Sequence, residues 1–257
     1  MRIIAVVNQK GGVAKTTTAV NLAVGLAQKH YRVLLVDLDP QAHSTLALRV
    51  NSSTIGPEQT VVPLFYGGTL TDIVVDTVAA NVQLVPASIR LATAVESLYS
   101  VTFREVKLAK ALEAVTADFD YVFLDCAPTL SVLSVNAIVA ATQILIPTPL
   151  SLYALDGLNE LLNTIETLKP DPNAFDWRVL FTRVKGHGKK RQAELARIID
   201  PIADRILTTR IRETEAVEDS QSDEEKIMAV VLRRGASNRG AQDYRRLVQE
   251  VTELWPA

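Results

Sequence analysis

The sequence predicts an α/β fold: a single domain over residues 1–257, with a mostly parallel, twisted sheet flanked by helices. Short apolar runs alternate with helical patterns along the whole chain, which is typical of β-α-β units. Hydrophobic residues make up 48% of the chain and aromatic residues only 5%, a composition that favours helices packed on a buried parallel sheet. We find no internal repeat, low-complexity segment or linker, so one domain is the simplest organisation.

The apolar runs and the helical patterns give the expected elements in order. Strands that are joined by helices imply right-handed crossovers and a parallel sheet. One stretch, 51–68, holds Ser, Gly and Pro without periodicity and is expected to be a surface loop. The expected strands are Ile3–Val7, Val33–Val36, Val82–Val85, Tyr121–Leu124, Ile144–Ile146 and Val179–Phe181. The expected helices are Thr16–Gln28, Glu105–Val115, a helix with one apolar face from Leu158 to Leu168, Arg191–Ile199 and Ala241–Leu254.

Charge and cysteine content narrow the class of protein. The net charge of −2 predicts no general affinity for nucleic acid, yet the segment from Trp177 onward holds 16 Lys and Arg against 13 Asp and Glu. A local basic patch is therefore possible late in the chain. The single cysteine, Cys126, allows no intrachain disulfide and suits a reducing compartment. We see no secretion signal and no apolar run of about 20 residues, and we expect a cytoplasmic protein.

The stretch Lys10–Thr17, KGGVAKTT, lies between the first strand and the first helix. A phosphate group needs several N–H donors and a nearby positive charge, and a turn that opens into a helix supplies both. The two glycines allow close approach of the backbone, Lys15 can bridge terminal phosphates, and Thr16 offers a hydroxyl to Mg²⁺. The strict pattern G-x-x-x-x-G-K-[ST] fails at Gln9 and Ala14, although the strand-turn-helix context fits.

Three aspartates follow expected strands at the carboxyl edge of the sheet. Asp37 and Asp39 come after Val33–Val36, and Asp125 comes after Tyr121–Leu124. A carboxylate placed after four apolar residues is costly to bury without a cation or donors. Ligands bind at this edge of an open parallel sheet, so the three are expected at the phosphate site, with Asp125 holding Mg²⁺ through water.

Together these motifs resemble the deviant Walker ATPases, and among them the ParA/Soj branch, which partitions plasmids and chromosomes. The resemblance runs from Met1 to near the C-terminus and is most specific in its first three motifs. The matching stretches are Lys10–Thr17, Asp37-Leu-Asp39-Pro-Gln41, Tyr121–Pro128, Ile146-Pro147, Tyr153–Leu158 and Arg212–Ala216.

The resemblance implies an ATPase that uses ATP, ADP and Mg²⁺. Lys10 would reach the phosphates of ATP in a partner subunit, Lys15 would act within its own subunit, and Asp39 would position the attacking water, so these three are the expected catalytic residues. Mg²⁺ would be held by Thr16, Asp37 and Asp125. The nucleotide would be bound by Lys10, Gly11, Gly12, Val13, Ala14, Lys15, Thr16 and Thr17, the last of these at the α-phosphate.

The resemblance also implies partners. ATP would drive a homodimer that binds duplex DNA without sequence preference, and a ParB-like protein would stimulate slow hydrolysis, which places the protein at the nucleoid. The candidate phosphate-contacting residues are Arg183, Lys185, Lys189, Lys190, Arg191, Arg210, Arg212, Arg233, Arg234, Arg239, Arg245 and Arg246.

The chain departs from the family at several positions. The family usually has Gly at Ala14 and Pro at Ala127. Arg183 stands where Met is common and Thr208 where Pro is common, so the resemblance assigns no adenine contact.

Three rivals share the fold. A MinD-like membrane ATPase, the main alternative, needs a basic amphipathic tail, whereas the apolar stripe from Leu247 to Trp255 is expected to be a core-packing helix; we therefore expect no membrane. An iron–sulfur carrier needs several thiolates, and Cys126 is alone. A non-hydrolysing nucleotide-binding scaffold is favoured only by Ala14.

Overall fold

The computed structural model describes residues 1–171, 173–184, 199–214 and 238–257, with the backbone alone over 152–156. Within these ranges the chain forms one eight-stranded sheet in the order β3-β4-β2-β5-β1-β6-β7-β8. All neighbouring strands run parallel except β3, which pairs antiparallel with β4. The strands are β1 (Arg2–Val6), β2 (Val33–Leu38), β3 (Val75–Asp76), β4 (Val82–Val85), β5 (Tyr121–Cys126), β6 (Gln143–Pro149), β7 (Asp176–Val184) and β8 (Ile206–Arg212).

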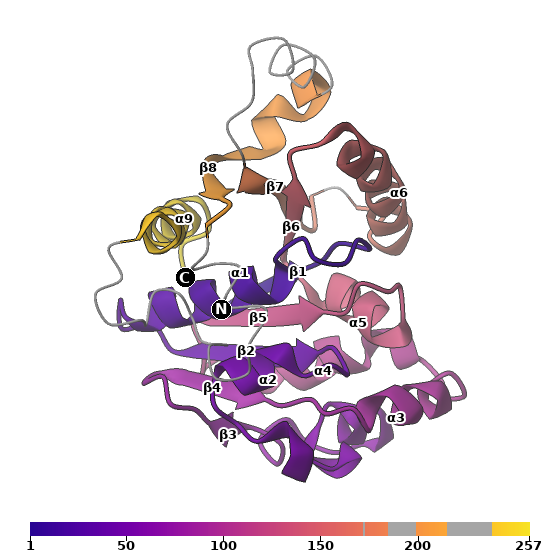
Figure 1. Cartoon of the computed structure of the whole chain (residues 1–257). Coiled ribbons are helices and arrows are strands. Elements are labelled where there is room, and N and C mark those ends of the chain that lie inside the picture. The colour runs from indigo at the N-terminus through magenta and orange to yellow at the C-terminus, as the bar shows by residue number, and fades with distance from the viewer. Residues whose placement is uncertain (172, 185–198, 215–237) are drawn as a thin grey trace.

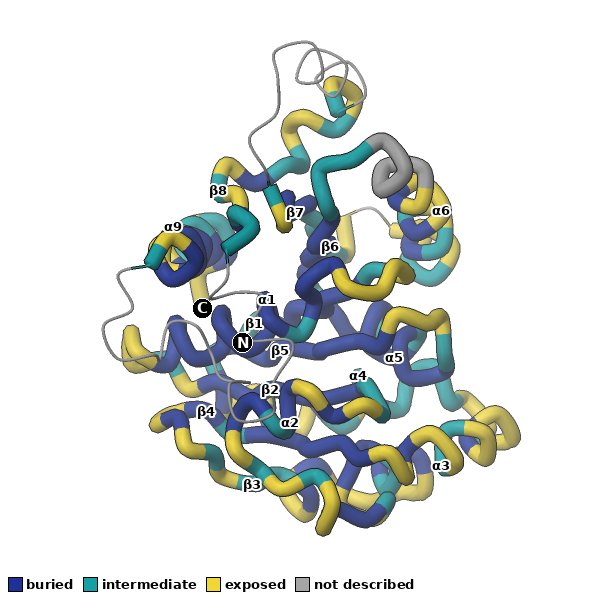
Figure 2. Tube along the Cα trace, viewed as in Figure 1, coloured by how far each residue is buried: buried dark blue, intermediate teal, exposed yellow. Residues whose placement is uncertain are grey.

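Helices cover both faces of this sheet (Figure 1). The central strands alternate between the two sides, as in β1, where Ile4 and Val6 pack with α1 and α9 while Ile3 and Ala5 pack with α5 and α6. Figure 2 shows the resulting buried centre as a dark band between exposed helix surfaces. The helices are α1 (Lys15–Ala27), α2 (His43–Ala47), α3 (Leu91–Leu98), α4 (Lys107–Glu113), α5 (Val132–Ala140), α6 (Leu152–Leu168) and α9 (Arg239–Leu254).

The six expected strands are confirmed, with ends that shift by a few residues. The expected helix over 191–199 lies almost wholly outside the described residues. The surface-loop expectation for 51–68 is wrong in part, because Val61, Leu64 and Phe65 are buried in the core. Three short 3-10 helices carry this segment, at Ser52–Thr54, Pro57–Gln59 and Val62–Tyr66, and such turns leave no helical periodicity to detect.

Helix α9 packs in the core, as its apolar stripe predicts. Leu247, Val248 and Val251 are at most 2% exposed, and Trp255 is 3% exposed. The contact with α1 is close, because a Cβ at Gly25 would overlap Val248 Cγ2. No helix in the described ranges has the length and apolar character needed to span a bilayer.

Strand β8 forms one edge of the sheet, and α9 lies along it. An edge strand presents unpaired N–H groups, and two carboxylates of α9 accept from them. Glu250 accepts from the backbone N–H of Thr208 at 2.6 Å and of Thr209 at 2.9 Å, and Asp243 accepts from the N–H of Arg212 at 3.0 Å. The edge is thus sealed by hydrogen bonds within the chain.

Candidate nucleotide-binding site

The loop between β1 and α1 is held in a conformation that bears strain. Gly12 has φ +68°, which costs glycine little. Ala14 also lies in the left-handed region, at φ 67° and ψ 33°, directly before α1 begins at Lys15. For a residue with a Cβ this conformation costs roughly 1–2 kcal/mol. The glycine that the family usually places here would adopt it freely, so Ala14 is a strained element of the loop.

The side chain of Lys15 folds back onto the start of the loop. Its Nζ donates to the backbone oxygen of Lys10 at 3.0 Å, and the residue is only 7% exposed. Burial lowers the pKa of the Lys15 ammonium, and the nearby charge of Asp125 opposes that shift. The positive charge that a phosphate needs is therefore already held inside the loop.

Asn8 ties the start of the loop to the sheet. Its Oδ1 accepts from the backbone N–H of Lys10 at 2.9 Å, and its Nδ2 donates to the oxygen of Pro147 at 2.8 Å. The sequence analysis missed this residue, although a polar side chain directly after a buried strand is a usable signal.

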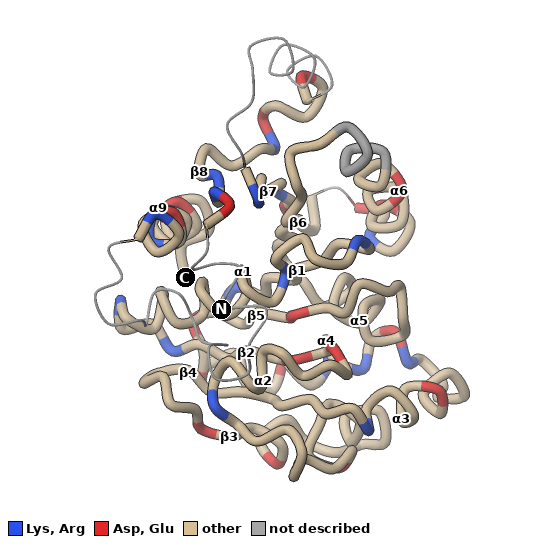
Figure 3. Tube along the Cα trace, viewed as in Figure 1, with Lys and Arg blue, Asp and Glu red and all other residues tan. Residues whose placement is uncertain are grey.

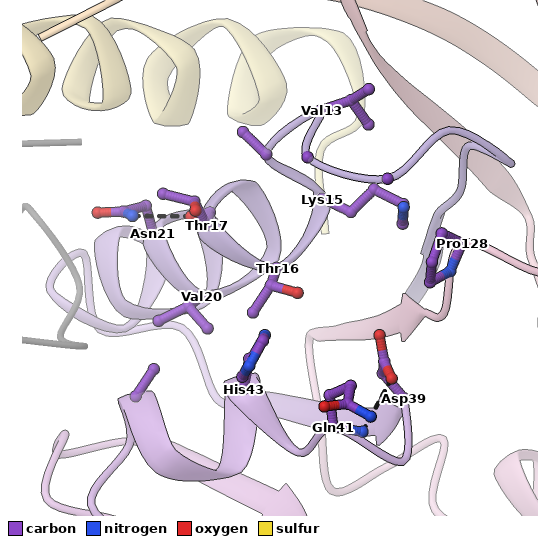
Figure 4. Close-up of a pocket in the computed structure, with 14 residues that line it drawn as sticks. Val13, Lys15, Thr16, Thr17, Val20, Asn21, Asp39, Gln41, His43 and Pro128 are labelled. Carbon is purple, nitrogen blue, oxygen red and sulfur yellow. Dashed lines mark hydrogen bonds between the residues drawn. The ribbon is translucent and has the colours of Figure 1, made fainter. Parts of the chain in front are cut away.

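A cavity of about 340 Å³ opens beside the loop. Figure 4 shows Lys15, Asp39 and Pro128 on one side of it, and Val20, Asn21 and His43 on another. Loop residues 11–17 and Asp39 thus meet at one cavity, while Lys10 is exposed and does not line it. The lining residues are Gly11, Gly12, Val13, Ala14, Lys15, Thr16, Thr17, Val20, Asn21, Asp39, Gln41, His43, Ala47 and Pro128.

Asp37 and Asp125 lie opposite each other on the neighbouring strands β2 and β5, and both are fully buried. Asp37 is well supplied with donors, because it accepts from Asp39 N at 3.1 Å, Thr45 N at 2.9 Å and Thr45 Oγ1 at 2.7 Å. Burial, and then the charge of Asp125, raises the pKa of Asp37. Asp37 therefore braces the turn to α2 in this state.

Asp125 differs because one of its oxygens lacks a partner. Ser44 Oγ donates to Oδ2 at 2.7 Å, while the buried Oδ1 accepts no hydrogen bond within the described residues. Burial raises the pKa of this carboxyl as well, while the hydroxyls of Ser44 and of the nearby Thr16 oppose that shift. A buried carboxylate oxygen without a donor is costly, so this position fits a donor brought by a ligand, such as a water bound to a cation.

The residues present fit Mg²⁺ in that indirect way. Among the described residues no group of three or more His, Cys, Asp or Glu could hold a metal ion. Mg²⁺ usually keeps several waters and takes few protein ligands together with substrate phosphates. The hydroxyl of Thr16 and the orphaned oxygen of Asp125 are the groups that would hold it, and when bound it would neutralise charge on the phosphates.

Asp39 lies at the mouth of the cavity and is half-buried. Its Oδ1 accepts from the backbone N–H of Gln41 at 2.9 Å (Figure 4). This hydrogen bond holds the carboxylate at the cavity through Oδ1, and Oδ2 takes no part in it. The position suits a group that orients a water next to the phosphates.

Basic residues lie on β7, β8 and α9 (Figure 3), and they differ in exposure and in ion pairing. Arg210 and Arg239 are exposed. Arg212 instead pairs with the buried Asp243, with its Nη2 at 2.7 Å and its Nε at 2.8 Å from that carboxylate. Arg183 contacts the phosphate loop. Lys185, Lys189, Lys190, Arg191, Arg233 and Arg234 lie outside the described residues.

Comparison with known proteins finds a family and several relatives for this chain. A family model described as an AAA domain matches residues 1–175. Soj, the sporulation initiation inhibitor protein of Bacillus subtilis (strain 168), is 43% identical over 173 residues, which cover 67% of this chain and 68% of Soj. The chromosome partitioning protein ParA of Myxococcus xanthus (strain DK1622) is 40% identical over 172 residues, covering 67% of this chain and 60% of that protein. The matched region thus spans about two thirds of these relatives or less.

Solved structures agree over nearly the whole chain. Cobyrinic acid a,c-diamide synthase from Mycobacterium smegmatis, with a bound ATP analogue and magnesium, has a TM-score of 0.80 at 29% identity, covering 100% of this chain and 96% of that one. A variant of Cyanothece McdA in complex with ATP has a TM-score of 0.81 at 26% identity, covering 98% and 95%. From the family match, the relatives and the shared fold, the chain belongs to the ParA/Soj-type P-loop ATPases of the MinD/ParA superfamily.

Proposed function

We propose that this protein is a DNA-partitioning ATPase whose ATP-bound form is a DNA-binding homodimer. The observation that carries the proposal is the unequal placement of the two loop lysines. Lys15 is buried in the loop, while Lys10 is exposed outside the cavity. One cation thus serves the chain's own nucleotide, and the other is available to a second molecule.

ATP with Mg²⁺ is the ligand that the cavity supports best. Loop residues 11–17 line it, and the start of α1 favours an anion there. The orphaned Asp125 Oδ1 and the hydroxyl of Thr16 fit a hydrated cation. The relatives that were solved with an ATP analogue, ADP or magnesium support the same assignment.

Dimerisation would depend on Lys10. Two ATP-loaded subunits that face each other bring two triphosphates together, and a lysine from each can pair with the opposite phosphates. Each such charge-assisted contact contributes roughly 1.5–3 kcal/mol. ADP lacks the γ-phosphate, so hydrolysis would weaken the dimer and make ATP a switch for assembly.

Hydrolysis would rely on positioning. Asp39 orients water at the mouth of the cavity, and Lys15 neutralises charge on the phosphates. Asp37 holds the backbone of Asp39 through its N–H, which fixes the turn that carries the catalytic carboxylate. We expect slow turnover that a ParB-like partner raises, as the resemblance to the ParA/Soj branch implies.

The DNA face would lie along β8 and α9, which places the protein at the nucleoid. Non-specific binding needs several cations on phosphates and weakens steeply with salt. Among the described residues we assign this role to Arg210, Arg239 and Arg246, which are exposed. Arg246 also lies 3.9 Å from Asp243, a longer contact than that of Arg212, and its side chain is 68% exposed. Arg212 is left out because its guanidinium already holds Asp243. Arg183 is left out as well, because it contacts the phosphate loop. Arg245 is exposed on α9 and remains a candidate. Lys185, Lys189, Lys190, Arg191, Arg233 and Arg234 fall outside the described ranges.

Two other functions have less support. A MinD-like membrane ATPase would use a C-terminal amphipathic helix, but the apolar face of α9 is buried against α1 and the sheet. The second function is that of a diamide synthase, because the synthase from M. smegmatis shares the fold at 29% identity. The Soj and ParA relatives are more similar in sequence, at 40–43% identity over their matched regions.

The test compares Lys10→Ala with Asp39→Ala by analytical ultracentrifugation with ADP and with ATP. We expect Lys10→Ala to bind ATP and stay monomeric, and Asp39→Ala to stay dimeric in ATP because hydrolysis is blocked. An ATP-dependent dimer formed by Lys10→Ala would refute the role of this lysine, and wild-type turnover in Asp39→Ala would refute the role of Asp39.

A further inference from the structure

The end of β7 departs from regular strand geometry beside the phosphate loop. Phe181 pairs with Arg210 and Val184 with Arg212, so β7 carries one more residue than β8 over this interval. Within this bulge Arg183 has φ 51°, a conformation that is uncommon for residues other than Gly, Asn and Asp. Bulges next to functional sites often redirect a side chain.

Here the bulge directs two successive side chains at two successive carbonyls of the loop. Thr182 Oγ1 donates to the oxygen of Val13 at 3.1 Å, and Arg183 Nη1 donates to the oxygen of Gly12 at 3.4 Å. In a planar trans peptide the N–H of the next residue points opposite to the carbonyl. Holding both carbonyls toward β7 therefore turns the N–H groups of Val13 and Ala14 away from β7.

This orientation is what an anion-binding loop requires. A phosphate is held by successive backbone N–H groups that converge on it, so the carbonyls of the same peptides must find donors elsewhere. Val13 and Ala14 both line the cavity. Thr182 and Arg183 satisfy the outward carbonyls and leave these N–H groups to the ligand.

A carboxylate orients the arginine. Arg183 Nη2 lies 3.3 Å from Glu213 Oε1, and the Glu213 side chain is 16% exposed against 47% for Arg183. The backbone N–H of Glu213 also donates to the oxygen of Val184 at 3.3 Å. The pair thus joins the phosphate loop to the residue that directly follows β8.

We propose that Arg183, oriented by Glu213, is a positioning residue that sets the loop peptides for phosphate binding, with Thr182 as its neighbour in the same task. The proposal rests on the proposed function, because its ligand is a nucleoside di- or triphosphate. The N–H groups concerned are those that cradle the inner phosphates in such loops, so ADP and ATP should be affected alike. This distinguishes Arg183 from Lys10, whose effect should appear only in ATP-dependent assembly.

The experiment uses Arg183→Asn in the full chain. Asn accepts the left-handed backbone at little cost but lacks the guanidinium. We would measure the dissociation constants of ADP and a non-hydrolysable ATP analogue, each with Mg²⁺, by calorimetry, and the melting temperature without ligand. We expect both constants to rise about tenfold, in line with the loss of one charge-assisted hydrogen bond, while the melting temperature stays within about 2 °C of wild type.

Three variants sharpen the result. Thr182→Val should weaken both nucleotides in the same direction, and Arg183→Lys should recover part of the affinity because an ammonium can still donate to Gly12. The matched control is Arg104→Asn, because Arg104 also donates to a backbone oxygen, that of Tyr99 at 2.6 Å, and pairs with Glu105 at 3.1 Å. Arg104 does not line the cavity, and its loss should leave both constants unchanged.

Unchanged dissociation constants in Arg183→Asn would overturn the inference. A loss of affinity would also overturn it if the melting temperature fell by more than about 2 °C and Arg183→Lys recovered no affinity. That result would indicate a role in folding alone. A wild-type protein that binds neither nucleotide would instead refute the proposed function, so the two failures can be told apart.

Discussion

The phosphate loop and the β8–α9 edge are both rich in charge, but they use it in opposite ways. In the loop, Lys10 is exposed, and the hydrogen bond of the Lys15 ammonium given by the described residues goes to a backbone oxygen, although the charge of Asp125 is nearby. At the edge, Arg212 is held by Asp243, and Glu250 occupies backbone N–H groups of β8. Removing one partner of a charge pair that the fold already makes costs stability, whereas a charge that forms no such pair can bind a ligand.

Lys15→Ala should show the largest effect and would break the comparison on the side of the loop. Its loss removes the buried cation from the cavity, so we expect nucleotide affinity to fall by at least about 100-fold. Fluorescent-nucleotide titration measures this, with Lys29→Ala as a control because Lys29 is exposed in the turn that follows α1. Retained micromolar affinity in Lys15→Ala would show that the loop is assigned wrongly.

Arg212→Ala tests the other side of the comparison. It would leave the buried carboxylate of Asp243 without its close cation and with the longer contact of 3.9 Å to the exposed Arg246. We expect a loss of about 2–3 kcal/mol of unfolding free energy, reduced from the cost of a fully buried pair because Arg212 is 37% exposed. Arg210→Ala, two residues before Arg212 in the same strand, should cost less than about 0.5 kcal/mol of unfolding free energy and should lower DNA affinity instead. Urea denaturation and DNA titration of both variants decide this. Equal stability of the two would contradict the distinction between paired and available arginines.

Glu250→Gln sharpens the comparison through pH. Burial opposes the ionised form of Glu250, but hydrogen bonds from Thr209 and Thr208 outweigh it and lower the pKa of this carboxyl. A lowered folded-state pKa gives stability that is present above the unfolded value of about 4.3 and is lost as pH falls through the folded value. We expect Glu250→Gln to be about 1 kcal/mol less stable than wild type at pH 7, with the difference shrinking below about pH 4.

Thermal unfolding across pH measures the Glu250 effect, and Glu253→Gln is the control, since Glu253 is exposed and accepts from the side chain of Gln249. A difference between wild type and Glu250→Gln that does not change with pH would refute the docking of an ionised carboxylate.

Ala14→Gly should give the smallest effect and a change of opposite sign. Glycine relieves the left-handed strain but widens the unfolded ensemble, so we expect a gain of up to about 1 kcal/mol. Ala19→Gly, in the regular part of α1, should cost about 1 kcal/mol or more. Chemical denaturation compares the two, and a loss of stability in Ala14→Gly would show that the loop is not strained there.

Sequence reasoning succeeds where the site is contiguous or lies at strand ends. The order strand, KGGVAKTT and helix places residues 11–17 together because neighbouring residues need no long-range information. Asp37 and Asp125 could be brought together because parallel strands end at one edge, and the register of β2 and β5 confirms this.

It fails where distant register decides the outcome. The pairing of Arg212 with Asp243 and the bulge that aims Arg183 at Gly12 depend on how β7, β8 and α9 meet. No local sequence pattern determines how these three elements pack together. The sequence therefore shows how many basic residues there are, but it does not reveal which side chains or carbonyls they contact.

The most direct test of the account is duplex-DNA binding by the purified protein with ADP, ATP or a non-hydrolysable ATP analogue, at low and at raised salt, with anionic liposomes as a parallel ligand. We expect binding that requires ATP or its analogue, weakens with salt and is absent from liposomes. DNA binding that is equal with ADP and with the ATP analogue, or binding to liposomes without DNA, would contradict an ATP-gated DNA-binding dimer.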